Sequence, residues 1–337
     1  MSRPTLVILI CLGSILNSYG QMIQGKILSQ EDQPVADAFV FISNSNYGVV
    51  SDENGIFEIE SSGTKSLELT VSQINFTLRT ETVQINGEPI IIKLEPKINE
   101  VISVELTQRY DPKIRERRLK RFSASLLGTD IKDRNIKILN IEDILIYHEE
   151  NALKIEASGP ILIENKKLGY LLRFFVSDFV LYDNEDLIYK GAVFFEDLQM
   201  KRREMAKAKK NRKKAYRLGS RMFLNELTKR GSLDRYVVSL GRFVDARGGY
   251  YDYDKIDPEN LQVSYLSDQR LYSLSIATVL KVYDKKTNVA SYLKPLESKI
   301  LIDTYGNIVN SSRVEELGFW SERRLGTLLP FDYSPEP

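Results

Sequence analysis

Charged side chains that could bind a ligand gather in the basic run at residues 201–217. This run holds ten basic residues against one acidic residue, Glu204. A field of that sign attracts phosphate and carboxylate groups, so we predict an anion-binding helix face here. The alternative is a solvated helix face that pairs with the protein's own acidic surface. The candidate binding residues are Lys201, Arg202, Arg203, Lys209, Lys210, Arg212, Lys213 and Lys214.

A second candidate stretch, at residues 245–254, combines glycines, tyrosines and carboxylates. Its candidate binding residues are Tyr250, Tyr251, Asp252, Tyr253 and Asp254. Aromatic rings beside carboxylates suit sugar rings, and clustered oxygens could hold a calcium ion. A loop of ordinary polarity is the alternative. We assign no metal and no cofactor to the chain.

Several enzyme classes are excluded by what the chain lacks. It has one histidine, His148, and one cysteine, Cys11. A zinc carboxypeptidase needs two imidazoles and a carboxylate on the metal, so that chemistry is excluded. A serine hydrolase would have to use His148 as its base, and the chain has no nucleophile elbow. We expect His148 to lie at the surface, near a strand end or a turn.

Adjacent acidic residues do not supply an acid/base pair either. Examples are Glu149–Glu150 and Glu196–Asp197. In a strand, neighbouring side chains point to opposite faces. A glycosidase needs two carboxylates about 5–9.5 Å apart across a cleft. We therefore expect a protein that is not an enzyme, with a glycosidase-like hydrolase at residues 129–337 as an alternative.

Residues 1–20 have the pattern of a signal peptide. Arg3 supplies the positive start, residues 6–16 are apolar, and Ser18-Tyr19-Gly20 is a small-residue cleavage site. The apolar run is shorter than the roughly 20 residues of a membrane-spanning helix, and no later segment is long and uncharged enough. The sequence therefore predicts export, with no transmembrane segment and no disulfide in the mature chain.

Residues 21–97 alternate apolar and polar side chains in short runs, which is typical of strands with one buried face. Ala38, Val40 and Ile42 fall on one such face. Asn54 and Gly55 can take the positive dihedrals of a tight turn, so we predict a hairpin around residues 52–55. Two packed sheets would bury these faces.

These runs carry a family resemblance. The matching residues are Gly25, Ile27, Pro34, Val35, Ala36, Ala38, Val40, Ile42, Gly48, Val49, Val50, Ser51, Asp52, Gly55, Phe57 and Ile59. They resemble the carboxypeptidase-regulatory-like domain, and Asp37 departs from a position where that family more often has glycine. The resemblance implies a prealbumin/transthyretin-like β-sandwich. In that family the module stands beside some metallocarboxypeptidases and before many TonB-dependent receptors of Bacteroidetes.

The rest of the chain reads as a linker and amphipathic helix at 98–128, then an uncharacterised β-rich α+β domain at 129–337. The helix should begin at Pro112, bury Ile114, Leu119, Phe122 and Leu126, and end at Gly128. An antiparallel meander is expected over 144–195, one long basic helix or two in tandem over 198–229, and strands that include 271–283. Residues 160–170, 211–220 and 320–333 are similar to exported Bacteroidetes proteins that place such a domain behind the same sandwich.

The predicted fold class is mainly β, an N-terminal sandwich followed by a β-rich α+β domain with a long basic helix. The predicted function is an exported, non-enzymatic binding or docking protein of the cell envelope, periplasmic or outer-membrane associated. Its expected partner is an envelope protein or an anionic glycan such as lipopolysaccharide, and not nucleic acid. The alternative is an accessory subunit of TonB-dependent nutrient uptake or of peptide processing.

Overall fold

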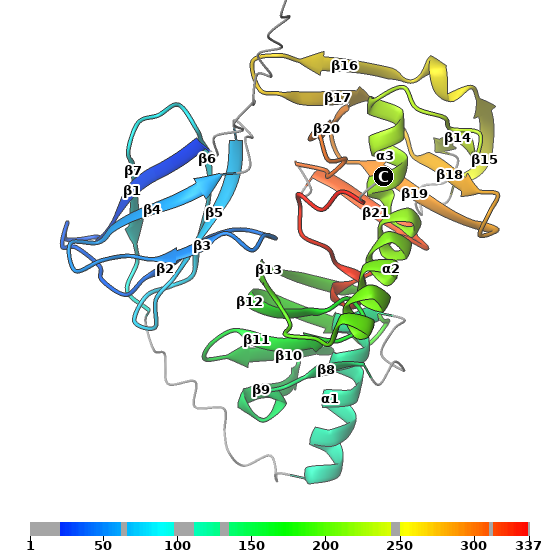
Figure 1. The fold of residues 1–337 in the computed structure, drawn as a ribbon. Coiled ribbons are helices and arrows are strands. Elements are labelled where there is room, and N and C mark those ends of the chain that lie inside the picture. Colours follow the sequence, from blue (N-terminus) through cyan, green and yellow to red (C-terminus); the bar gives the residue numbers. More distant parts are fainter. Residues whose placement is uncertain are drawn as a thin grey trace, which may run out of the picture.

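The computed structural model describes residues 21–61, 66–97, 111–128, 135–243, 250–309 and 313–335 (Figure 1). The predicted signal peptide lies outside these ranges, as does most of the predicted linker. No helix in these ranges is long and apolar enough to cross a membrane. The fold is mainly β, as predicted.

Residues 21–97 form a two-sheet β-sandwich, here called the sandwich. One sheet has the strand order β4 (Ile56–Ser61), β1 (Gln21–Ser29), β7 (Ile90–Leu94). The other has the order β3 (Gly48–Val50), β2 (Phe39–Ile42), β5 (Ser66–Ser72), β6 (Arg79–Gln84). Ala38, Val40 and Ile42 are buried in the core between the sheets. The predicted sandwich and its buried face are confirmed.

The turn at residues 52–55 exists, but the predicted hairpin is wrong. Gly55 has φ 73°, and Asn54 donates its amide to Asp52 Oδ1 at 2.9 Å. The strands on either side, β3 and β4, belong to different sheets. Just before the turn, the buried Ser51 hydroxyl donates to the Val35 carbonyl at 2.9 Å and accepts from the Ala38 amide at 3.0 Å. These bonds hold the chain beside the start of β2, so the turn crosses from one sheet to the other.

The remaining described residues, 111–335, are called the body. Its first sheet contains β8 (Ile136–Ile138), β9 (Ile144–Glu149), β10 (Ala152–Ala157), β11 (Ile161–Asn165), β12 (Tyr170–Tyr182) and β13 (Leu187–Asp197). The pairing is antiparallel, but it is not the simple meander we predicted. β12 is 13 residues long and shares one edge between the shorter β11 and β10, while β13 covers its other edge.

Helix α1 (Pro112–Leu127) packs on this sheet. Asp111 caps it by accepting the Lys113 amide at 2.8 Å, and Gly128 ends it, both at the predicted positions. Phe122 is fully buried, with its ring 4.9 Å from that of Phe179. Leu119 and Leu126 are buried in the same cluster, whereas Ile114 is exposed, contrary to prediction. Ile114 lies in the first turn of the helix, outside the cluster.

The predicted long helix is two helices in tandem, α2 (Arg202–Leu218) and α3 (Ser220–Thr228), separated at Gly219 (Figure 1). α3 packs on a second cluster, which includes Phe223 and Trp320. Two further sheets of the body contribute side chains to this second cluster. Their strands are β14 (Tyr236–Phe243), β15 (Tyr250–Ile256), β18 (Leu280–Asp284), β19 (Val289–Pro295) and β21 (Val314–Gly318), and then β16 (Gln262–Leu266), β17 (Leu271–Ser275) and β20 (Lys299–Ile302).

The single strand predicted at 271–283 is also wrong, because β17 and β18 lie in different sheets. The chain between them is held on both sides. The Ile276 amide donates to the Ser298 carbonyl at 3.2 Å, and the Thr278 hydroxyl donates to the Gly241 carbonyl at 2.6 Å. The apolar pattern over residues 271–283 is therefore uninterrupted in the sequence, although the chain leaves one sheet and enters another between β17 and β18.

The sandwich and the body are joined by rings and by backbone hydrogen bonds. Phe41 is fully buried, with ring centroids 4.9 Å from Phe175 and 5.8 Å from Phe194. The Asn44 amide donates to the Val193 carbonyl, and the Phe195 amide to the Ser45 carbonyl, each at 2.7 Å. The β2–β3 loop thus continues the first sheet of the body at the edge of β13. These contacts fix the position of the sandwich on the body.

Candidate functional site

Helix α2 packs on the first sheet of the body through its inner face. The Arg212 guanidinium donates to the Leu168 carbonyl at 2.6 Å and lies 3.8 Å from the centre of the Tyr170 ring. It also pairs with Asp197 at 2.9 Å. Its side chain is 11% exposed, so Arg212 serves as an anchor and does not belong with the cations that face solvent.

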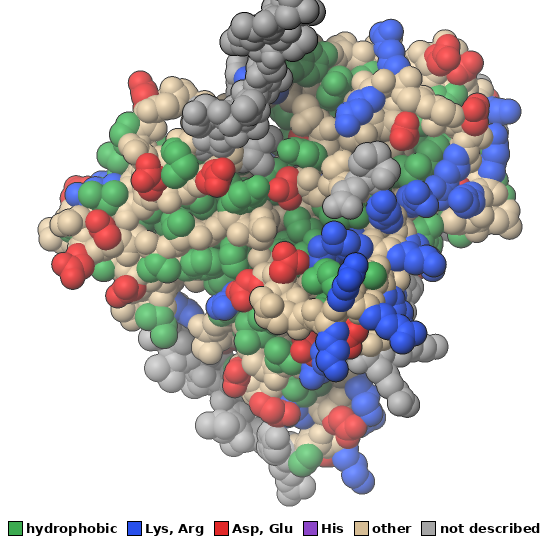
Figure 2. Space-filling model, viewed as in Figure 1, with side chains coloured by type: hydrophobic (Ala, Val, Ile, Leu, Met, Phe, Trp, Pro, Cys, Tyr) green, Lys and Arg blue, Asp and Glu red, His purple; other side chains and the backbone are tan. Residues whose placement is uncertain are grey.

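The opposite face of α2 carries a continuous row of exposed cations, here called the cationic stripe. Its members are Arg203, Lys207, Lys210, Lys214 and Arg217. At 3.6 residues per turn they fall within about 80° of the helix circumference. In the part of the chain that the structure describes, no ion pair joins any of them to an acidic residue. Figure 2 shows Lys and Arg side chains gathered over α2.

The other predicted basic residues have different places. Lys201 precedes the helix, and its amide donates to Glu204 at 3.1 Å. Arg202 is exposed beside the stripe. Lys209 and Lys213 take part in further interactions. Of the eight predicted basic candidates, Arg203, Lys210 and Lys214 therefore lie on the stripe.

Two stripe residues, Lys207 and Arg217, were missed by our reading of the sequence. The signal that could have found them is the spacing of four, three, four and three residues through the basic run. Side chains at such spacing share one face of a helix. A count of charges that ignores this periodicity selects Arg212, which faces inward. It omits Lys207 and Arg217.

The five candidate residues of the second stretch, 250–254, lie in strand β15 and not in a loop. Tyr253 has its ring 5.9 Å from that of Tyr292, with Lys281 Nζ 4.8 Å from its centre. Its strand neighbour Asp254 points to the opposite face, so the two cannot meet one sugar. The side chains of Tyr250, Tyr251 and Asp252 lie outside those that the structure describes. Within the described ranges, no three His, Cys, Asp or Glu residues are grouped to hold a metal ion.

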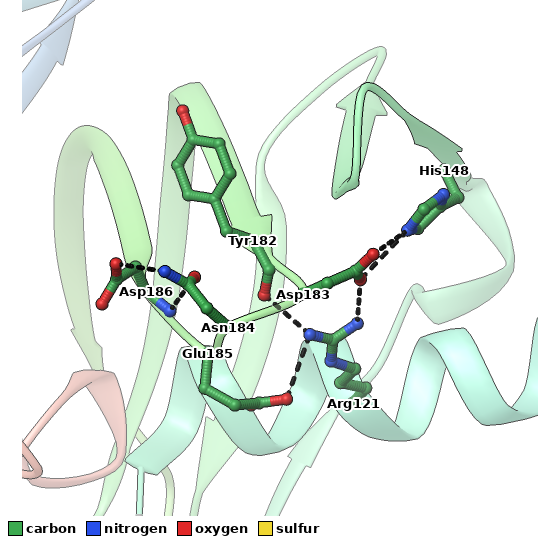
Figure 3. Close-up of polar contacts among 7 residues, drawn as sticks. All are labelled: Arg121, His148, Tyr182, Asp183, Asn184, Glu185 and Asp186. Carbon is green, nitrogen blue, oxygen red and sulfur yellow. Dashed lines mark hydrogen bonds and ion pairs between the residues drawn. The ribbon is translucent and has the colours of Figure 1, made fainter.

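His148 is exposed, as predicted, and lies in a surface cluster that fastens α1 to the sheet (Figure 3). Its Nε2 is 3.1 Å from both oxygens of Asp183. Arg121 pairs with Asp183 at 3.2 Å and with Glu185 at 3.0 Å, and donates to the Tyr182 carbonyl at 2.7 Å. Hydrogen bonds from His148 and then Arg121 lower the pKa of Asp183. The cluster therefore joins α1 to the turn between β12 and β13.

The acidic pairs behave in two ways. Glu196 and Asp197 each pair with a different arginine, as expected for strand neighbours on opposite faces. Glu149 and Glu150 instead converge on Lys154, at 2.8 and 3.2 Å. Glu150 has φ 50° and turns the chain, so the expected divergence is wrong at this pair. Neither pair presents two carboxylates to a common cleft.

A polar hollow of about 210 Å³ opens on the first sheet of the body. It is lined by Asn140, Asp143, Ile144, Ala157, Ser158, Gly159, Pro160, Leu162 and Arg173. Asp143 is the one carboxylate among these lining residues. The hollow therefore does not bring together the two carboxylates that the glycosidase alternative needs.

The C-terminal tail, residues 325–335, crosses from the body to the sandwich. The Phe331 amide donates to the Asn44 carbonyl at 2.7 Å. Asp332 follows Phe331, and its carboxylate accepts a hydrogen bond from the Tyr47 hydroxyl. Burial raises the pKa of Asp332, against opposing hydrogen bonds and the charge of Arg221. A half-buried ionisable group thus lies where the tail meets the sandwich.

Replacing Asp332 with asparagine is expected to change how stability depends on pH. Because its pKa is raised in the fold, the folded state holds the proton more tightly than the unfolded chain. The unfolding free energy then falls as pH rises from about 3.9, the ordinary value, through the raised pKa. Asp332→Asn removes this loss and can still accept from Tyr47. In urea unfolding at pH 4 and pH 7, the variant should gain stability relative to the wild type at the higher pH, and a shift in the other direction would contradict this.

Comparisons with known proteins match parts of this chain. No curated protein matches it. Solved structures that resemble part of it include two interface mutants of a type II cohesin–X-dockerin complex from Acetivibrio cellulolyticus, at 20% and 19% identity with TM-scores of 0.19 and 0.17. These matches cover 22% and 23% of this chain, which spans about half, 52%, of each solved chain. Scores of this size do not establish a shared overall fold.

The family model that matches is the CarboxypepD_reg-like domain, over residues 23–105. This range contains all of the strands of the sandwich except the first two residues of β1. The predicted domain is thereby confirmed, and the N-terminal sandwich of this chain is a CarboxypepD_reg-like domain.

Proposed function

We propose that this protein is an exported, non-enzymatic binding protein of the cell envelope, and that α2 holds an anionic partner on its outer face. The observation that carries the proposal is the cationic stripe. Five exposed cations in one line repel one another, and this costs free energy that a bound polyanion would recover. An anionic envelope glycan or lipopolysaccharide has the required charge.

The fixed position of the sandwich on the body supports a docking role. Phe41 and the β2–β3 loop hold the sandwich on the body, so the outer surfaces of the sandwich and α2 belong to one frame. A protein of this kind can engage an envelope component through one part while the other binds a partner. The proposed non-enzymatic role is supported by the sequence, which has one histidine, His148, and this side chain lies in the surface cluster with Asp183.

The test is to neutralise the stripe. In the test variant, Arg203, Lys207, Lys210 and Lys214 are replaced with glutamine. In the control variant, four exposed lysines elsewhere, Lys97, Lys190, Lys255 and Lys286, receive the same change. Binding to purified polygalacturonate and to lipopolysaccharide is measured by calorimetry at low and physiological salt. Each basic residue near an anionic surface contributes about 1 kcal/mol, so the test variant should bind at least about tenfold more weakly than the control.

Equal binding by the two variants, with both folded by circular dichroism, would show that α2 is a solvated helix face. The proposal would then fail for this helix.

The CarboxypepD_reg-like match favours a second candidate function, an accessory subunit of TonB-dependent nutrient uptake or of peptide processing. Such a subunit would dock on a receptor or a peptidase through the sandwich. Affinity purification of the intact protein from envelope extracts, with receptor-sized partners identified by mass spectrometry, tests it. Recovery of the protein without any such partner would contradict this candidate.

A further inference from the structure

The spacing of the cationic stripe limits the shape of its ligand. Successive members are four, three, four and three residues apart, which is about 4.5–6 Å per step at 1.5 Å per residue. The whole row is about 21 Å long. The cations stand in a row along a helix surface, and Arg217 at one end also borders a small hollow beside Trp320. A compact anion can therefore reach only one or two of them. A ligand gains from all five only if it is extended and carries its own charges at similar intervals.

The side chains at the two ends differ from those between them. Arg203 and Arg217 are arginines, whose planar forks can hold a carboxylate through two parallel hydrogen bonds. The middle three, Lys207, Lys210 and Lys214, are lysines, which are point charges on flexible stems. Such a row can fix a chain at its ends and follow small differences in charge spacing between them.

We propose that α2 binds a linear acidic polysaccharide along its axis, with one carboxylate-bearing sugar against each cation of the stripe. The step between cations is comparable to the length of one pyranose ring in an extended chain. Phosphates of duplex DNA are denser, at about 3.4 Å along each strand, and phosphates of lipopolysaccharide are clustered near its lipid end. This inference rests on the proposed function and specifies its ligand.

The experiment is a chain-length series of oligogalacturonates of two to ten sugars, titrated into the intact protein by calorimetry. Affinity should rise at least about tenfold between two and five sugars. Between five and ten sugars it should rise by no more than about sixfold, the number of registers a ten-sugar chain can adopt, because the stripe then has no further cation to offer. A rise well beyond that between five and ten sugars would overturn the inference.

A charge-matched variant separates spacing from net charge. Lys207→Gln and Lys210→Gln interrupt the stripe, while Gln84→Lys and Ser267→Lys restore the two charges at exposed positions elsewhere. The affinity for five sugars should fall to that for two. Full affinity in this variant would overturn the inference.

The remaining outcomes distinguish this inference from the proposed function. Equal binding of polygalacturonate, polyphosphate and duplex DNA at matched charge, or tighter binding of lipopolysaccharide than of the ten-sugar chain, would overturn the inference alone. Absence of binding to every one of these polyanions would overturn the inference and the proposed function together.

Discussion

Replacing Phe41 with alanine is expected to lower the free energy of unfolding by about 3–5 kcal/mol, the usual cost of removing a fully buried aromatic side chain. Phe41 stands on the face of β2 that is turned away from the core of the sandwich, and its ring contacts those of Phe39, Phe175 and Phe194. The cavity would open at the boundary between the sandwich and the body. The loss should therefore appear as weaker coupling between them.

Urea unfolding checks this prediction when two probes are followed together. The single tryptophan, Trp320, lies in the second cluster of the body and reports on it, while far-ultraviolet circular dichroism reports on all the strands. The two transitions should coincide more closely in the wild type than in Phe41→Ala. Val50→Ala on the neighbouring strand β3 is the control, because Val50 is 58% exposed. A Phe41 variant no less stable than this control would contradict the prediction.

Replacing Arg221 with alanine is expected to release the C-terminal tail and to cost about 2–4 kcal/mol. The partly buried Arg221 guanidinium donates to the carbonyls of Pro330, Phe331 and Tyr333, each at 2.8 Å. Burial also lowers the pKa of Arg221, because removing a charge from water disfavours it. The loss should therefore be smaller than the sum of about 1–3 kcal/mol for each carbonyl left without a donor.

Hydrogen exchange of the tail amides measures the release. Protection at Phe331, whose amide donates to Asn44, should fall in Arg221→Ala and fall less in Arg221→Lys, since lysine can satisfy only part of the three-carbonyl set. Lys229→Ala, at the exposed end of α3, should leave tail exchange unchanged. Unchanged protection at Phe331 in Arg221→Ala would mean that the tail is held by its apolar contacts alone.

Sequence reasoning succeeded where a local signal decides the local structure. Asp111 and Gly128 marked both ends of α1, and the alternation of Ala38, Val40 and Ile42 identified the buried face of β2. These signals depend on a few neighbouring residues and on the period of a strand or helix. The match of the sandwich to its domain family follows from the same alternation and turns.

Sequence reasoning failed where a distant part of the chain decides. Phe41 falls on the face that alternation assigns to solvent, and it is buried by Phe175 from the body. Arg212 has the charge of a ligand-binding residue. Its guanidinium instead donates to the Leu168 and Gly169 carbonyls and packs on the Tyr170 ring. Residues 250–254 have the composition of a loop, but they pair with β14 as a strand. No local pattern contains these partners.

The backbone bonds between the β2–β3 loop and β13 have a consequence for solubility. An unpaired strand edge invites pairing with other chains, and natural proteins cover such edges. Asn44 and Ser45 occupy the outer edge of β13, while Phe39 and Phe41 cover the neighbouring rings of Phe175 and Phe194. The sandwich therefore also shields the edge of β13, and the apolar rings beside it, from other chains. Without it, the body would present an open edge and an apolar surface side by side, a combination that favours aggregation.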